Sequence, residues 1–212
     1  MLNVYLSYYQ DPDPKRRKEI DACVECLCNN RSISRLIVLT EAPLPAAARA
    51  AITIPQDVRP AMASIFDLIT NHSGDNDVNM VINSDCFFDE RDAAAINAIG
   101  PDDAYCLLRV EISRAVPLRV DRRKTKRNIK KHEGDMQDCW IIRGRPKAGM
   151  WLDFNSGTPG CDNRLAYELQ KAGYRILNPY SRIRIYHYHR TGLRRYTARQ
   201  RVPQPYAFPE PC

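Results

Sequence analysis

Three short segments of the sequence combine residue types that can bind a metal ion or move a proton. The first is Asn83-Ser84-Asp85, which directly follows the apolar run 78–82. A carboxylate at the end of a buried strand lies at the edge where open α/β sheets bind ligands, and it can hold a divalent cation that bridges two phosphates. Asp85 could equally cap or turn the loop after the strand, so this segment alone leaves both roles open.

The second segment is His187-Tyr188-His189, which lies in a stretch of strand-forming residues. Side chains at positions i and i+2 of a strand point the same way, so both imidazoles can face one sheet edge. The chain has only four histidines, and such a pair is a plausible metal-binding element. An ordinary surface pair is the alternative.

The third segment places Asp162 after the Gly/Pro-rich loop 157–160 and directly before an apolar helical pattern. A carboxylate on such a loop can act as a general base toward an acceptor hydroxyl. Aspartate is also a common helix N-cap, and for the segment taken alone the cap is the simpler interpretation.

The elements that must position these residues alternate between strand and helix in the first half of the chain. Such alternation predicts an α/β fold with an open sheet. Strands are expected at Asn3–Tyr8, Ser34–Thr40, Ile52–Ile54 and Val78–Ser84, and helices from Pro14, at Pro60–Thr70 and at Glu90–Ile99. In the less regular second half, strands are expected at Ala104–Ile112, Cys139–Ile142, Tyr174–Leu177 and Ile183–His189, with a helix at Asp162–Ala172. The tail Val202–Cys212 holds four prolines and is expected to be an extended strap or disordered.

The composition indicates an anionic partner or substrate. The net charge is +7, and arginines far outnumber lysines, which suits forked contacts with phosphate. Neither GxxxxGK[ST] nor GxGxxG occurs, so a bound nucleotide must be held by arginine and metal. The start of the chain lacks the features of a signal peptide and no apolar run is long enough to span a membrane, which predicts a cytoplasmic protein with reduced thiols.

The order of the three segments resembles the GT-A fold of nucleotide-sugar glycosyltransferases. Val58–Ala61 is similar to the Asn-Arg-Ala segment of β-galactosyltransferases, Gly160–Asn163 to their Gly-Glu-Asp loop, and Ile185–His189 to their closing metal-ligand strand. The Asn-Ser-Asp strand end, together with Gln137–Trp140, also resembles a group of uncharacterised GT-A-like proteins from microbes and viruses. The likeness covers residues 3 to 196. It implies a single GT-A-like domain over 1–201, with a mixed, mostly parallel central sheet flanked by helices. Residues 1–100 would form the nucleotide-sugar-binding half, 101–201 the acceptor half, and 202–212 a Pro-rich tail.

This resemblance implies a metal-dependent, inverting glycosyltransferase with a UDP-sugar as donor and Mn²⁺ or Mg²⁺ as cofactor. Two positions depart from the family pattern, because Asn83 replaces the first acid of Asp-x-Asp and Cys161 replaces the Glu of the loop. Asp85 and one of His187 and His189 would coordinate the metal, with Asn83 beside it, and Arg59 would contact the donor diphosphate. Asp162 would take the proton of the acceptor hydroxyl. Tyr8 or Tyr9 could stack on the base, although packing on the edge strand is the simpler interpretation, and Asp138 could be a second carboxylate near the acceptor or an ordinary loop residue.

A basic stretch, 119–131, holds eight cations in thirteen residues and favours a polyanionic acceptor over an ordinary solvated face. These residues are Arg119, Arg122, Arg123, Lys124, Lys126, Arg127, Lys130 and Lys131. A hydroxylated base in viral DNA is the favoured acceptor, and it would have to leave the duplex stack to reach Asp162. An anionic glycan or a lipid-linked saccharide is the alternative. A non-catalytic nucleic-acid-binding protein on a degenerate transferase fold is the hypothesis from another class. The sequence leaves the oligomeric state open.

Overall fold

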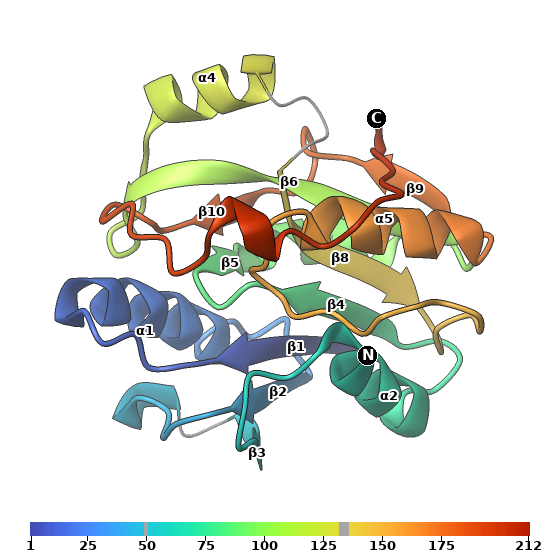
Figure 1. Cartoon of the computed structure of the whole chain (residues 1–212), viewed down its shortest axis with the longest axis horizontal. Coiled ribbons are helices and arrows are strands. Elements are labelled where there is room, and N and C mark those ends of the chain that lie inside the picture. The colour runs from blue at the N-terminus through green and yellow to red at the C-terminus, as the bar shows by residue number, and fades with distance from the viewer. Residues whose placement is uncertain (49–50, 132–135) are drawn as a thin grey trace.

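A curled central sheet forms the body of the protein (Figure 1). The computed structural model describes residues 1–48, 51–131 and 136–212. Along the sheet the strand order is β11-β9-β6-β8-β4-β1-β2-β3. These strands are β1 (Leu2–Tyr8), β2 (Arg35–Thr40), β3 (Ile52–Pro55), β4 (Val78–Ile82), β6 (Asp103–Arg114), β8 (Gln137–Arg143), β9 (Arg175–Asn178) and β11 (Glu210–Pro211).

The sheet is mixed, so the expectation of a mostly parallel sheet needs a correction. Strands β4, β1, β2 and β3 pair in parallel, as the alternating first half predicts. Strand β8 runs antiparallel to both of its neighbours, β4 and β6. Strand β7 already turns the chain back antiparallel to β6, and β8 pairs with β6 in that same reversed direction.

A smaller group of strands continues from the far end of β6. There β10 (Ile185–His187) pairs in parallel with β6 and antiparallel with β5 (Cys86–Phe88), and β7 (Arg119–Val120) pairs with the last residues of β6. Strand β6 therefore belongs to both sets of strands. This arrangement brings the loop after β4, the middle of β6 and the end of β10 to one place.

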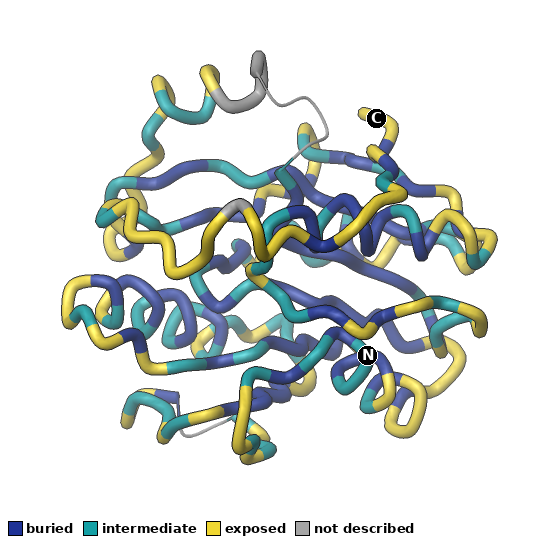
Figure 2. The backbone as a smooth tube through the Cα atoms, viewed as in Figure 1, coloured by how far each residue is buried: buried dark blue, intermediate teal, exposed yellow. Residues whose placement is uncertain are grey.

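Helices cover both faces of the central sheet and bury two hydrophobic clusters. One cluster packs α1 against alternate residues of β1, and the other packs α2 and α5 against the opposite face. Figure 2 shows the buried strands between the partly exposed helices. The helices are α1 (Pro14–Cys28), α2 (Met62–His72), α3 (Ala93–Asn97), α4 (Arg122–Lys131) and α5 (Cys161–Lys171), with 3-10 turns η1 (Ala46–Ala48), η2 (Glu90–Asp92) and η3 (Ala198–Gln200).

Some expected elements differ in extent from the observed ones. The helix expected at 90–99 is a 3-10 turn followed by α3, and the strand expected at 183–189 pairs only over β10. The tail is a strap: Val202 and Ala207 are buried, and β11 pairs with β9. Among the described residues, no helix combines the length and apolarity that crossing a membrane requires.

Candidate active site

Asp85, His187 and His189 come together where β5 meets β10. One ligand atom from each lies within 4.8 Å of the others. The backbone dictates this meeting, because Cys86 pairs with His187 across the two strands and the Tyr188 N–H donates to the Asp85 carbonyl at 2.9 Å. The sequence segments that suggested metal binding are therefore brought together by strand register.

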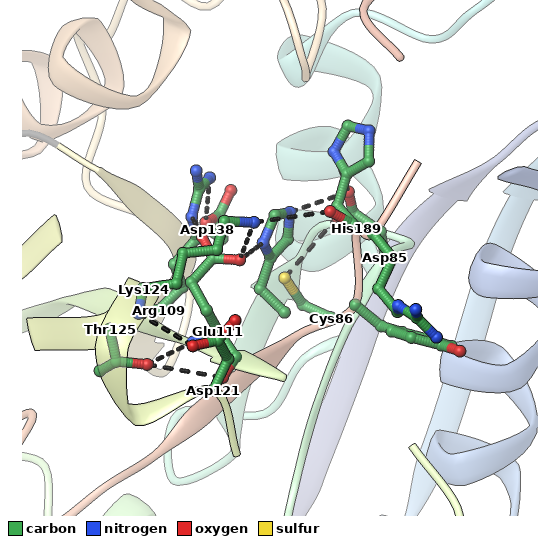
Figure 3. Close-up of polar contacts among 12 residues, drawn as sticks. Asp85, Cys86, Arg109, Glu111, Asp121, Lys124, Thr125, Asp138 and His189 are labelled. Carbon is green, nitrogen blue, oxygen red and sulfur yellow. Dashed lines mark hydrogen bonds and ion pairs between the residues drawn. The ribbon is translucent and has the colours of Figure 1, made fainter. Parts of the chain in front are cut away.

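A second carboxylate, that of Glu111, orients His187; Figure 3 shows Glu111 next to Lys124 and Thr125. Nδ1 of His187 lies 3.1 Å from Oε2 of Glu111, which is buried on β6, and this leaves Nε2 facing Asp85 at 3.2 Å. A carboxylate on the far nitrogen is a common feature of metal-binding histidines, because it fixes the ring and the tautomer. Glu111 also pairs with Lys124 of α4, Nζ to Oε2, at 2.7 Å.

The electrostatics of Asp85 and His189 suit metal ligation. Burial and the charge of Arg109 lower the pKa of His187, but Asp85 and Glu111 outweigh both and raise it, so a metal there would displace a proton from this ring. Burial raises the pKa of Asp85, but the charges and hydrogen bonds of His187 and Arg16 outweigh burial and hold it well below its usual range. Burial and the charge of Arg16 lower the pKa of His189 to about 4, so this imidazole is neutral at pH 7. Its Nε2 is buried and has no hydrogen-bond partner among the described residues. An ionised carboxylate and a neutral imidazole with an unsatisfied nitrogen are the forms that bind divalent metals.

Arg16 on α1 is a part of the cluster that sequence reasoning missed. Its Nη2 bonds Oδ2 of Asp85 at 2.5 Å, and its Nη1 bonds Glu19 and the Tyr188 carbonyl, each at 3.1 Å. A metal at this site therefore shares the Asp85 carboxylate with a buried guanidinium. Arg16 and Glu19 are spaced i, i+3 on the same face as Ile20, and charges on an apolar helix face are the signal that marks them.

The pocket in front of the cluster is lined with arginines, Arg59 among them. Its guanidinium lies 4.2 Å from the Tyr9 ring centroid, and its Nε lies 3.6 Å from Oε1 of Glu41. Tyr9 lines the pocket, whereas Tyr8 does not: the Tyr8 ring is buried and its hydroxyl donates to Asp21 at 2.7 Å. Of the two tyrosines expected to stack on the base, Tyr8 and Tyr9, Tyr9 is therefore the one that the structure places in this pocket.

Asn83 and Asp138 are joined by a hydrogen bond. Nδ2 of Asn83 donates to Oδ1 of Asp138 at 2.7 Å, and Oδ1 of Asn83 accepts from Ser156 Oγ at 2.8 Å. Arg109 on β6 donates to the other oxygen of Asp138 at 2.9 Å and pairs with Glu111 at 3.0 Å. Asn83 thus links β8 to the loop that carries Ser156, and an aspartate in its place would lack the N–H that donates to Asp138.

A second pocket adjoins the first and contains Asp162. The two pockets share Asn83, Arg109 and Asp138 in their linings. Asp162 is partly exposed in the first turn of α5. The N-cap of that helix is Gly160, with φ of 81°, so Asp162 is not the N-cap.

A C-terminal segment, residues 193–196, completes the walls of the pockets. It contributes Leu193, Arg194, Arg195 and Tyr196 to the first pocket, and Arg194 and Tyr196 to the second. The segment is anchored to the first loop of the chain by Arg195, whose Nη2 lies 2.7 Å from Oδ1 of the buried Asp11. The sequence showed only that this region is rich in arginine.

The basic stretch forms β7 and α4 beside the cluster. The side chains of Arg119, Arg122, Arg123, Lys126 and Arg127 are exposed, whereas Lys124 is turned toward Glu111. The side chains of Lys130 and Lys131 lie outside the described part of the structure. The exposed members suit an external anionic partner, and Lys124 belongs to the surroundings of His187.

Solved structures similar to this chain include two sugar-transferring enzymes. A mannosyltransferase from Pyrobaculum calidifontis, solved with GDP-Man and Mn²⁺, aligns with 84% of this chain at 15% identity and a TM-score of 0.50. Glucosyl-3-phosphoglycerate synthase from Mycobacterium tuberculosis aligns with 84% at 13% identity and a TM-score of 0.51. This chain spans 54% of the mannosyltransferase and 70% of the synthase. No family model and no curated protein matches the sequence. The chain therefore has a GT-A-like fold.

Proposed function

We propose that this protein is a metal-dependent glycosyltransferase that moves a sugar from a nucleoside diphosphate sugar to a hydroxyl acceptor. The observation that carries the proposal is the meeting of Asp85, His187 and His189 in an arginine-lined pocket beside a second pocket with a carboxylate. The fold shared with a mannosyltransferase solved with GDP-Man and Mn²⁺ supports it.

The metal-ligand cluster and the arginines would both contact the diphosphate of the donor. Asp85 and the two histidines would hold Mn²⁺ or Mg²⁺, and a divalent metal there offsets charge on the leaving diphosphate. Arg59 would add a forked contact to the same phosphates. Tyr9 offers a ring for stacking on the base. A UDP-sugar is the donor we propose first, and a GDP-sugar is the alternative.

The second pocket would hold the acceptor. Asp162 would take the proton of the attacking hydroxyl, which then displaces the diphosphate in line and inverts the anomeric carbon. Asp138 would position Arg109 and Asn83, because it accepts a hydrogen bond from each.

The exposed cations of β7 and α4 support an acceptor that is anionic or carried by an anionic molecule. DNA with a hydroxylated base fits these cations. A saccharide linked to an anionic lipid could contact these cations through its phosphate and the exposed aliphatic side chains of the adjacent β6–β7 turn through its lipid. This acceptor therefore has the stronger support.

A panel of UDP- and GDP-sugars with Mn²⁺ tests the proposal. Donor hydrolysis and thermal stabilisation are expected with one sugar class, and both should disappear with EDTA. A panel in which no nucleotide sugar is hydrolysed or stabilises the protein contradicts the proposal.

A further inference from the structure

The turn that joins β6 to β7 exposes aliphatic side chains to solvent. Val116 is 75% exposed, Leu118 39% and Val120 36%, within five residues of one another. Exposed aliphatic residues gathered on one turn indicate an interaction surface, whereas single ones are ordinary.

Arginines surround these aliphatic residues. Arg114, Arg119, Arg122 and Arg190 line a groove together with Ser113 and Asp121. Within the described parts of the chain, none of these four guanidinium groups forms an ion pair with a carboxylate. The groove therefore presents an excess of positive charge, four guanidinium groups against the carboxylate of Asp121, directly beside the aliphatic turn.

The basic face of α4 extends the same surface. Arg123, Lys126 and Arg127 are exposed on this helix, which stands at the edge of the molecule above the end of β6 (Figure 1). Lys124 fixes the position of the helix by its ion pair with the buried Glu111.

We propose that the β6–β7 turn and α4 form a docking surface for an anionic phospholipid membrane. Cations near a bilayer surface are attracted to anionic headgroups, and aliphatic side chains gain free energy by entering the boundary of the acyl chains. The arginine groove would take a headgroup phosphate. A nucleic acid would use the cations as well, but aliphatic side chains gain little from contact with a phosphate backbone.

The docking surface is continuous with the candidate active site. Arg190 of the groove directly follows His189, and Nζ of Lys124 lies 3.5 Å from the carbonyl oxygen of His189. Docking would therefore hold the metal-ligand cluster close to the bilayer. If the proposed function holds, an acceptor carried by a lipid would be presented to the site by the membrane itself.

Vesicle co-sedimentation tests the docking without any donor or activity. Wild-type protein should bind vesicles of phosphatidylcholine with about 30% phosphatidylglycerol, and should not bind pure phosphatidylcholine. The double variant Val116→Ser with Leu118→Ser should bind the anionic vesicles at least about tenfold more weakly. Arg119→Ser with Arg122→Ser should weaken binding by about fivefold for each lost cation. Ile52→Ser, at an exposed aliphatic position on β3, is the matched control and should bind as wild type does.

Duplex DNA binding is measured on the same proteins. The aliphatic double variant should bind DNA as wild type does, because phosphate contacts involve only the cations. The proposal is overturned if wild type ignores anionic vesicles, or if the aliphatic double variant binds them as tightly as wild type. If the aliphatic double variant binds anionic vesicles as tightly as wild type, and duplex DNA displaces the protein from those vesicles, nucleic acid is the partner. All these side chains are exposed, so unchanged thermal unfolding checks that each variant is folded.

Discussion

Replacing Asn83 by aspartate recreates the Asp-x-Asp pattern of the GT-A family, and we expect it to damage this protein. Nδ2 of Asn83 donates to Oδ1 of Asp138 at 2.7 Å, so the variant would place two carboxylates at that separation. The side chain of Asp138 is only 8% exposed, which limits screening by water.

The cost can be worked from this geometry. Two unit charges about 3 Å apart repel by roughly 5 kcal/mol at an effective dielectric of about 20, and a hydrogen bond to a charged group, worth about 1.5–3 kcal/mol, is lost. Uptake of one proton by the pair relieves the repulsion and costs about 4 kcal/mol at pH 7 for an ordinary aspartate. We therefore expect Asn83→Asp to lower the free energy of unfolding by about 2–4 kcal/mol at pH 7.

Urea unfolding at pH 7 and pH 5 measures this effect. The loss of unfolding free energy relative to wild type should be smaller at pH 5 than at pH 7. The folded variant binds the proton shared by the two carboxylates more tightly than the unfolded chain does, so the variant regains stability as the pH falls. Ser156→Ala removes the other hydrogen bond of Asn83 without adding charge, and should cost about 0.5–1.5 kcal/mol at both pH values. A variant as stable as wild type at pH 7, or one that binds Mn²⁺ more tightly, would refute the reasoning.

Three further predictions follow from individual carboxylates. Asp162→Asn should cut the rate of sugar transfer by about 10²–10⁴-fold and leave the donor KM nearly unchanged, as steady-state kinetics would show. Glu111→Gln should weaken Mn²⁺ binding by about 10–100-fold, measured by titration of free Mn²⁺; unchanged affinity would mean that this carboxylate has no part in orienting a ligand. Burial raises the pKa of Glu168, but hydrogen bonds from the Trp151 N–H and Arg164 outweigh burial and lower it. The stability contributed by Glu168 should therefore be present at pH 7 and be lost as pH falls through the lowered pKa, and Glu168→Gln should flatten this acid limb in urea unfolding.

Much of the fold could be predicted because strands β1, β2 and β4 of the first half are buried on both faces. Continuous apolar runs such as 35–40 and 78–82 are typical of such strands, and both are observed. The reversed direction of β8 could not be predicted, because apolar patterning carries no information on strand direction. The short strands β5 and β7 pair over only a few residues and give too little periodicity to detect.

Part of the candidate site could likewise be predicted from the sequence, and part could not. Asp85 and the two histidines were predictable since each follows or occupies a recognisable strand. Arg16 and Glu111 were missed because their roles depend on partners more than sixty residues away in sequence. Buried charges on otherwise apolar elements were the available signal, and Arg109 with Glu111, at i and i+2 on β6, shows it most clearly.

The central claim is that Asp85, His187 and His189 hold a divalent metal that binds the donor diphosphate. Calorimetric titration of UDP with Mn²⁺ or with EDTA, on wild type and on Asp85→Asn, tests it most directly. Asparagine is preferred to alanine because its oxygen can still accept from the buried Arg16. Mn²⁺ should tighten UDP binding by at least about tenfold in wild type and should have no effect in the variant. Equal UDP affinity with Mn²⁺ and with EDTA in wild type, or a full effect of Mn²⁺ in the variant, would contradict the account.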